Sequence, residues 1–172
     1  MTTTATKTFT VRAIPADVVA ALRVRDDSCA APELAIDGDG GSPLRCCLRV
    51  SRPGEEMFLV SYAPLRRWAA ESGAHPGAYV ETGPVFIHAQ PCDGPQHDGW
   101  PEDYRGLPRV LRAYGVNGRI RGGVVVPAGE SRPERFIDEL FSDADVAFVH
   151  ARALEFGCFT FWIDRAEPLD GA

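Results

Sequence analysis

Alternating hydrophobic and polar positions along the chain predict a protein built mainly of short strands. Such runs, or apolar runs of strand length, occupy residues 9–14, 44–50, 56–63, 85–89, 146–152 and 158–164. Short amphipathic segments at residues 15–25, 65–71 and 131–142 predict helices, the last with Ser131 as its N-terminal cap. Together these elements predict an α+β fold with a mainly antiparallel sheet, strongly bent or in two parts, and two or three short helices.

The pair Asn117-Gly118, between two further alternating runs, predicts a β-hairpin with a two-residue turn. With this pair at the tip, Tyr114 opposes Arg121. One face of the hairpin then carries a polar set, Arg112, Tyr114, Arg119 and Arg121. The other face is expected to meet the core through Leu111, Ala113, Ile120 and Val124.

The last two strands, residues 146–152 and 158–164, are separated by a short connection and predict a second antiparallel pair. If Arg152 opposes Cys158, then His150 opposes Thr160. One face becomes uniformly apolar and is predicted to be buried, with Ala147, Val149, Ala151, Phe159, Phe161 and Ile163. The polar residues, including His150 and Arg152, are then expected to point out of the sheet.

Residues 9–166 are predicted to form a single α+β domain between two tails, residues 1–8 and 167–172. The longest irregular stretch is residues 90–106, which contains three prolines and three glycines. A loop of this length in a compact domain is usually functional or mobile.

The composition is that of an ordinary globular protein, with 45% hydrophobic and 24% charged residues and a net charge of −6. The acidic balance argues against nucleic acid as a partner. A membrane partner is not expected, because no run of about 18 apolar residues is present. A nucleotide cofactor is not expected either, since no glycine-rich phosphate loop follows a strand. The threonine-rich N-terminus lacks a signal-peptide pattern, which predicts a cytoplasmic protein with reduced cysteines. In the expected strand 44–50, alternation sends Cys46 and Cys47 to opposite faces.

Six short blocks occur in an order and spacing that resemble a known family. They are Pro53-Gly54-Glu55-Glu56, Ser61-Tyr62-Ala63-Pro64, Gly83-Pro84-Val85-Phe86-Ile87-His88, Leu111-Arg112-Ala113-Tyr114, Phe148-Val149-His150-Ala151 and Gly157-Cys158-Phe159. From about residue 9 to 166 the chain resembles the bacterial family called domain of unknown function 1203. The resemblance implies a small, single-domain bacterial protein and supplies no activity. This chain has Gly115 where the family often has an acidic residue.

Two strand histidines, His88 and His150, are the leading candidates for catalysis. Imidazole titrates near neutral pH, so two histidines in one pocket could serve as acid and base. Tyr114 could donate a hydrogen bond to developing charge. The predicted substrate-binding residues, on the same expected polar faces, are Arg112, Arg121, Arg152 and Thr160. Guanidinium groups bind carboxylate or phosphate with paired hydrogen bonds, so the predicted substrate is a small organic anion.

A thiol or a metal gives alternative chemistry. Cys158, beside His150 and Arg152, is a candidate nucleophile, and Cys47, between two arginines, is a second one. Each histidine and cysteine could equally be a structural residue. Cys92 and His97, with His88 upstream, could bind zinc, although the stretch lacks paired Cys-x-x-Cys or His-x-x-x-His spacing.

The sequence therefore supports three hypotheses. The first is a small enzyme without a cofactor that performs acid–base chemistry, as an isomerase, dehydratase or hydrolase, on an organic anion. The second is a non-catalytic module that binds an anion or a protein, with a homodimer left open. The third is a zinc-binding protein that uses Cys92, His97 and His88.

Overall fold

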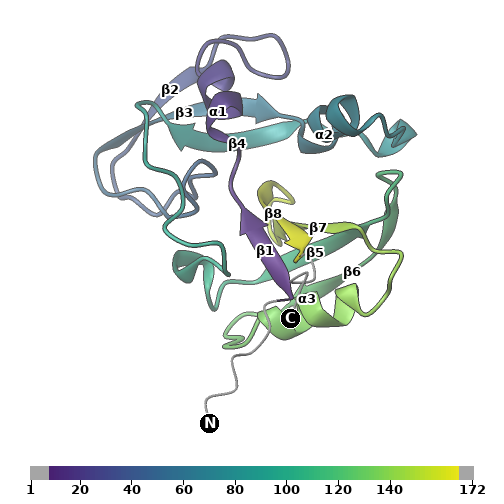
Figure 1. The fold of residues 1–172 in the computed structure, drawn as a ribbon. Coiled ribbons are helices and arrows are strands. Elements are labelled where there is room, and N and C mark those ends of the chain that lie inside the picture. The colour runs from purple at the N-terminus through teal and green to yellow at the C-terminus, as the bar shows by residue number, and fades with distance from the viewer. Residues whose placement is uncertain (1–7, 167–172) are drawn as a thin grey trace, which may run out of the picture.

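The computed structural model describes residues 8–166, which form two antiparallel sheets (Figure 1). The five-stranded sheet has the order β1-β8-β7-β5-β6 and the three-stranded sheet the order β2-β3-β4. The strands of the larger sheet are β1 (Phe9–Arg12), β5 (Arg109–Tyr114), β6 (Ile120–Val126), β7 (Phe148–Ala153) and β8 (Phe159–Arg165). Those of the smaller sheet are β2 (Glu33–Asp37), β3 (Glu55–Tyr62) and β4 (Gly83–His88). The predicted α+β fold with a two-part antiparallel sheet is confirmed.

The helices are short. They are α1 (Ala16–Leu22), α2 (Pro64–Ser72) and α3 (Glu134–Phe141), with single 3-10 turns at η1 (Gly77–Tyr79) and η2 (Glu102–Tyr104). The predicted cap Ser131 lies outside α3, which begins after Pro133 without a side-chain cap. No helix within residues 8–166 has the length and apolar character needed to cross a bilayer. The two predicted tails fall outside the described residues, except for Thr8.

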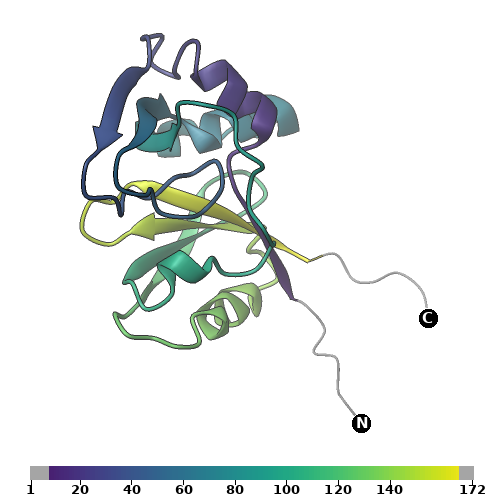
Figure 2. The same cartoon turned by 90° about the vertical axis from the view of Figure 1, so that its left-hand side faces the viewer.

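Both faces of the five-stranded sheet are covered except along the edge strand β6, most of whose residues are exposed (Figures 1 and 2). On one face α3 packs through Ile137 and Phe141 onto a core that includes Leu111 and Phe161. On the other face the three-stranded sheet and α1 form a second core, which contains Leu22, Val60, Ile87, Phe148 and Trp162. Because a second layer lies on each face, β7 and β8 are buried along nearly their whole length.

Strands β7 and β8 pair in a different register from the prediction. His150 opposes Trp162 rather than Thr160, a slip of two residues. Because side chains alternate with a period of two, this slip preserves the predicted faces, and Val149, Ala151, Phe161 and Ile163 are buried. A bulge after Ala151 moves Phe159 to the opposite face, where its ring lies 5.2 Å from that of His150. The expectation that the polar face is open is wrong, because the second core covers it.

The hairpin of β5 and β6 is present, but its turn is longer than predicted. The Gly115 N–H donates to the Arg119 carbonyl and the Gly118 N–H donates to the Gly115 carbonyl, at 3.0 and 2.8 Å. Gly118 has φ 73°, the left-handed conformation required at the end of such a three-residue loop. Tyr114 therefore opposes Ile120 instead of Arg121.

Strand β2 was not predicted. It is an edge strand, and its apolar residues Leu34 and Ile36 are 57% and 64% exposed. The apolar residues of this strand therefore do not mark a core face, which is why the pattern of buried positions does not reveal it.

Candidate metal centre

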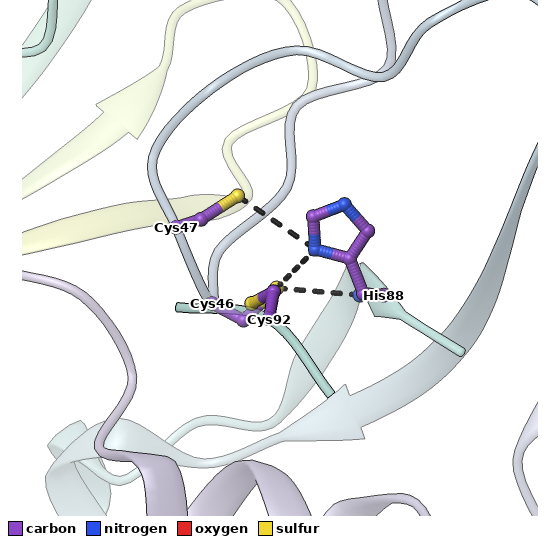
Figure 3. A group of neighbouring side chains, drawn as sticks. All are labelled: Cys46, Cys47, His88 and Cys92. Atoms are coloured by element: carbon purple, nitrogen blue, oxygen red, sulfur yellow. Dashed lines mark hydrogen bonds between the residues drawn. The ribbon is translucent and has the colours of Figure 1, made fainter. Parts of the chain in front are cut away.

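Four potential metal ligands converge where the three-stranded sheet meets its connections (Figure 3). They are the thiols of Cys46, Cys47 and Cys92 and the imidazole of His88, and their ligand atoms all lie within 4.8 Å of one another. His88 is the last residue of β4, and Cys92 lies in the irregular segment that follows it. None of the chain's cysteines is in a disulfide. The group is therefore a preformed set of three sulfur ligands and one nitrogen ligand.

A tight turn places the two neighbouring cysteines on the same side. Residues 44–50 were expected to form a strand, but the Leu48 N–H donates to the Leu44 carbonyl at 2.9 Å, which closes one helix-like turn. Leu48 then reverses the chain with φ 60°. In a strand Cys46 and Cys47 would face opposite ways, whereas in this turn both thiols approach His88 Nδ1, at 3.2 and 3.7 Å. The strand prediction is wrong, and this difference creates the site.

The other ring nitrogen of His88 is held by an ion pair. Glu55 Oε1 lies 3.0 Å from His88 Nε2, and Arg49 binds both oxygens of that carboxylate. When Nε2–H donates to Glu55, the lone pair of Nδ1 faces the thiols, as a metal ligand requires. Arg49 Nη2 also lies 2.6 Å from Nε2, where it can donate only to an unprotonated nitrogen. A metal at Nδ1 would therefore select the tautomer that donates to Glu55.

The thiols differ in how easily they lose a proton. A hydrogen bond from Cys46, together with the backbone N–H and the charge of Arg49, lowers the pKa of Cys47 to about 7. The pKa of Cys46 is raised, because its proton is shared with Cys47 and because the thiol is buried. Hydrogen bonding from Arg49 lowers the pKa of Glu55 to about 2, so this carboxylate is ionised. Burial lowers the pKa of His88, which favours the neutral imidazole that binds metals.

A cavity of about 670 Å³ adjoins the cluster. Cys47, His88 and Cys92 line it, whereas Cys46 is not part of its wall. Its wall also contains charged residues of both signs: Arg49, Arg52, Asp93, Glu102 and Asp103. Cys46 is 4% exposed, Cys47 is half-buried and Cys92 is exposed. The cluster thus has a shielded side at Cys46 and an accessible side at Cys92.

The structure brings together only part of the predicted zinc set. His88 and Cys92 belong to the cluster, as the third hypothesis expected. His97 lines the cavity but is not in the ligand group, and its Nδ1 accepts a hydrogen bond from the Gly99 N–H at 3.2 Å. Cys46 and Cys47 take part instead. Their adjacency in the sequence was the available signal, and the wrong strand assignment concealed it.

His150 lies in a different environment from His88. It is 1% exposed and sits among aromatic rings, with the ring centroids of Tyr114 and Trp162 at 4.6 and 4.4 Å. Neither ring nitrogen has a hydrogen-bond partner within the described part of the chain. Burial, helped by nearby arginine charges, lowers the pKa of His150 well below its usual value. His150 does not line the cavity beside His88, so that cavity does not bring the two histidines together.

The predicted anion-binding arginines are bound by the protein's own carboxylates. Arg112 and Arg152 both pair with Glu81 Oε1, at 2.8 and 2.5 Å. Arg121 pairs with Asp145 at 2.7 Å, away from this group. Arg152 also donates to the Gly157 carbonyl. The three arginines therefore form ion pairs within the protein. Their role in substrate binding stays a prediction.

The remaining predicted residues, Tyr114, Thr160 and Cys158, differ in their burial. Tyr114 is buried and stacks on Phe148 with ring centroids 5.1 Å apart. Thr160 is buried, and its hydroxyl finds no partner in the described residues. Cys158 is half-buried, and its thiol contacts the Phe156 carbonyl at 3.6 Å. The catalytic roles predicted for Tyr114 and Cys158 stay predictions.

The fold and the cluster define a two-sheet α+β protein with a candidate metal centre of three cysteines and one histidine. A family model described as a protein of unknown function, DUF1203, matches residues 41–165, and the chain belongs to this family. The resemblance found in the sequence is confirmed, and the matched residues include the whole cluster. No curated protein and no solved structure matches the chain. The family description states no activity.

Proposed function

We propose that the protein binds one zinc ion through the thiolates of Cys46, Cys47 and Cys92 and the Nδ1 of His88. The proposal is carried by one observation, the convergence of these four ligand atoms within 4.8 Å. Three sulfur ligands and one imidazole form a ligand set typical of tetrahedral zinc. Soft thiolate ligands also disfavour magnesium and calcium, which prefer oxygen.

The surroundings of the cluster support a bound cation with thiolate ligands. Three thiolates exceed the charge of one divalent ion, and the positive charge of Arg49, which is shared with the Glu55 carboxylate, lies near Cys46 and Cys47. Glu55 accepts a hydrogen bond from Nε2, the ring nitrogen of His88 that faces away from the thiols. A carboxylate is a usual partner of that nitrogen in a zinc-bound histidine. Glu55 would thus orient the imidazole of His88, and Arg49 would hold Glu55 in place and offset part of the negative charge of the thiolates.

Four protein ligands fill a tetrahedral coordination shell, which favours a structural role. The ligands come from the turn at residues 44–49, the end of β4 and the segment after it. Zinc would tie these three pieces together and fix one wall of the cavity. The acid–base enzyme predicted from the sequence is not the function that we propose. Its two histidines lie in different environments, and Glu81 binds two of its arginines.

The test is metal content and its dependence on the cluster. Protein purified without chelators, or reduced and incubated with zinc, should hold one zinc per chain by elemental analysis. Cys92→Ser, at an exposed ligand, should lower zinc affinity, and so should Cys46→Ser. Cys29→Ser and Cys158→Ser, which change thiols outside the cluster, should leave it unaltered. Failure of the reduced protein to take up zinc would overturn the proposal. Equal affinity in all four variants would also overturn it.

A further inference from the structure

Two of the cluster's thiols face the cavity together. Cys47 and Cys92 both line it, and Cys92 is exposed. Their sulfur atoms lie within 4.8 Å of each other, and the side chains are close enough to interact by a hydrogen bond. A small oxidant that enters the cavity would therefore meet this pair first.

Cys92 also lies on a part of the chain that can shift. From residue 91 to 97, no backbone hydrogen bond to another backbone group is present in the described structure. The flanks are anchored, since Arg23 donates to the carbonyls of His88 and Gln90, and Val11 N–H donates to Asp98. A disulfide needs a sulfur separation of about 2 Å, so the two sulfurs must close by less than about 3 Å. The segment can supply that movement without breaking either sheet.

The other possible disulfides within the cluster, which involve Cys46, are less favourable. The Cα atoms of neighbours across a trans peptide are about 3.8 Å apart, below the roughly 4.4 Å that disulfides usually need. A bond between Cys46 and Cys47 would therefore be strained. Cys46 is shielded from the cavity, and its sulfur accepts a hydrogen bond from the His88 N–H at 3.3 Å. Cys47 is consequently the favoured partner of Cys92.

We infer that Cys47 and Cys92 form a redox-sensitive pair that peroxide converts to a disulfide, with release of the zinc. The release step rests on the zinc site proposed above. The Cys92 thiolate attacks one oxygen of hydrogen peroxide, the O–O bond breaks, and hydroxide leaves, which gives a sulfenic acid. The Cys47 thiolate attacks that sulfur, the S–O bond breaks, and a second hydroxide leaves as the S–S bond forms.

The reaction balances within the cluster and the oxidant. Two thiolates lose two electrons, hydrogen peroxide gains them, and two protons from solvent convert both hydroxides to water. Zinc loses two of its four ligands, because a disulfide sulfur carries no negative charge. Cys46 and His88 alone hold the ion weakly, so it dissociates. A thiol reductant restores both ligands.

The experiment treats the zinc-loaded full chain with hydrogen peroxide and follows zinc with a chromogenic chelator. Peptide mapping under non-reducing conditions identifies the linked cysteines. We expect the loss of two thiols and one zinc per chain, a Cys47–Cys92 crosslink, and recovery of zinc binding after reduction. In Cys47→Ser the sulfenic acid at Cys92 should persist and be trapped by dimedone. Cys158→Ser is the matched control and should crosslink like the parent chain.

The outcomes separate the two proposals. If the chain binds no zinc, the proposed function fails, and peptide mapping of the metal-free chain still tests the crosslink. If zinc binds but peroxide leaves both thiols and the zinc in place, the redox pair is wrong and the zinc site stands. A crosslink that involves Cys46, or oxidation of Cys92 to a sulfinic acid without a crosslink, also overturns the inference.

Discussion

Replacing Glu55 tests whether the ion pair behind His88 prepares its ring for a metal. The Glu55 carboxylate accepts from Nε2, 3.0 Å away, and so leaves Nδ1 free to bind zinc. In Glu55→Ala only Arg49 Nη2, at 2.6 Å, still faces Nε2, and it favours the tautomer with a proton on Nδ1. Zinc must then displace that proton. Glu55→Gln keeps an oxygen that can accept from Nε2–H but loses the charge.

Loss of such an outer partner typically lowers metal affinity by about 10- to 100-fold, or about 1.4 to 2.7 kcal/mol. We expect Glu55→Gln near the lower limit, because an acceptor remains, and Glu55→Ala near the upper limit. Competition titration with a chromogenic zinc chelator measures the zinc affinity of both variants. Glu56→Gln is the control, since its side chain is exposed on the next residue of β3. Zinc binding by Glu55→Ala as tight as that of the control would refute the role of Glu55.

Three further predictions concern the fold. Burial lowers the pKa of His150 well below its usual value. The unfolded chain therefore gains a proton that the folded chain excludes, and the free energy of unfolding falls by up to about 1.4 kcal/mol per pH unit below about pH 6.5. In His150→Phe the free energy of unfolding, measured by urea titration at several pH values, should depend less on pH. An unchanged pH dependence would contradict this role of His150. Glu81→Gln removes the carboxylate from Arg152, whose side chain is 10% exposed. We expect a loss of about 1–2 kcal/mol, since Glu81 itself is partly exposed, and no loss in denaturant titrations would count against the pair. Gly118→Ala should cost about 1–2 kcal/mol in the same titrations, because φ is +73° and an added Cβ would lie 2.7 Å from a proline ring. The control Gly122→Ala, with open space around its Cβ, should cost less than Gly118→Ala.

Periodicity predicted most elements of the fold because strands and helices that bury one face leave a regular pattern. Helix α3, which buries Ile137 and Phe141, follows this rule. In the hairpin Leu111 and Ala113 are buried as expected, but Ile120, which was also expected in the core, is 37% exposed. The pattern could not show that a second sheet covers the polar face of β7. A face with His150 and Arg152 looks exposed by its chemistry, but aromatic neighbours and the Glu81 carboxylate make its burial possible. The predicted register of β7 and β8 was also wrong by two residues. The apolar pattern could not distinguish the two registers, because both bury Val149, Ala151, Phe161 and Ile163.

The candidate site was only half predictable for a related reason. His88 and Cys92 lie close in the sequence, so their proximity could be inferred directly. Cys46 and Cys47 reach them because residues 44–48 form a helix-like turn that ends with Leu48 in a left-handed conformation, which a β-pattern of alternating residues does not reveal. Single-residue changes in backbone conformation leave almost no trace in hydrophobic periodicity. They nevertheless decide which side chains meet.

The position of the cluster between the sheets determines what zinc would do for the whole fold. The turn at residues 44–49 is tied to the five-stranded sheet by Arg45, which donates from Nε to the Phe159 carbonyl at 2.9 Å. Tyr104, buried in the core of that sheet, donates to the Leu44 carbonyl at 3.3 Å. On its other side the same turn meets His88, at the end of β4 in the three-stranded sheet. The backbone of the turn is also bonded to β4, since the Arg45 N–H donates to the Phe86 carbonyl at 2.9 Å. Zinc would add a second link between the turn and β4. Its binding energy would thus stabilise a turn that contacts both sheets, and through it their packing.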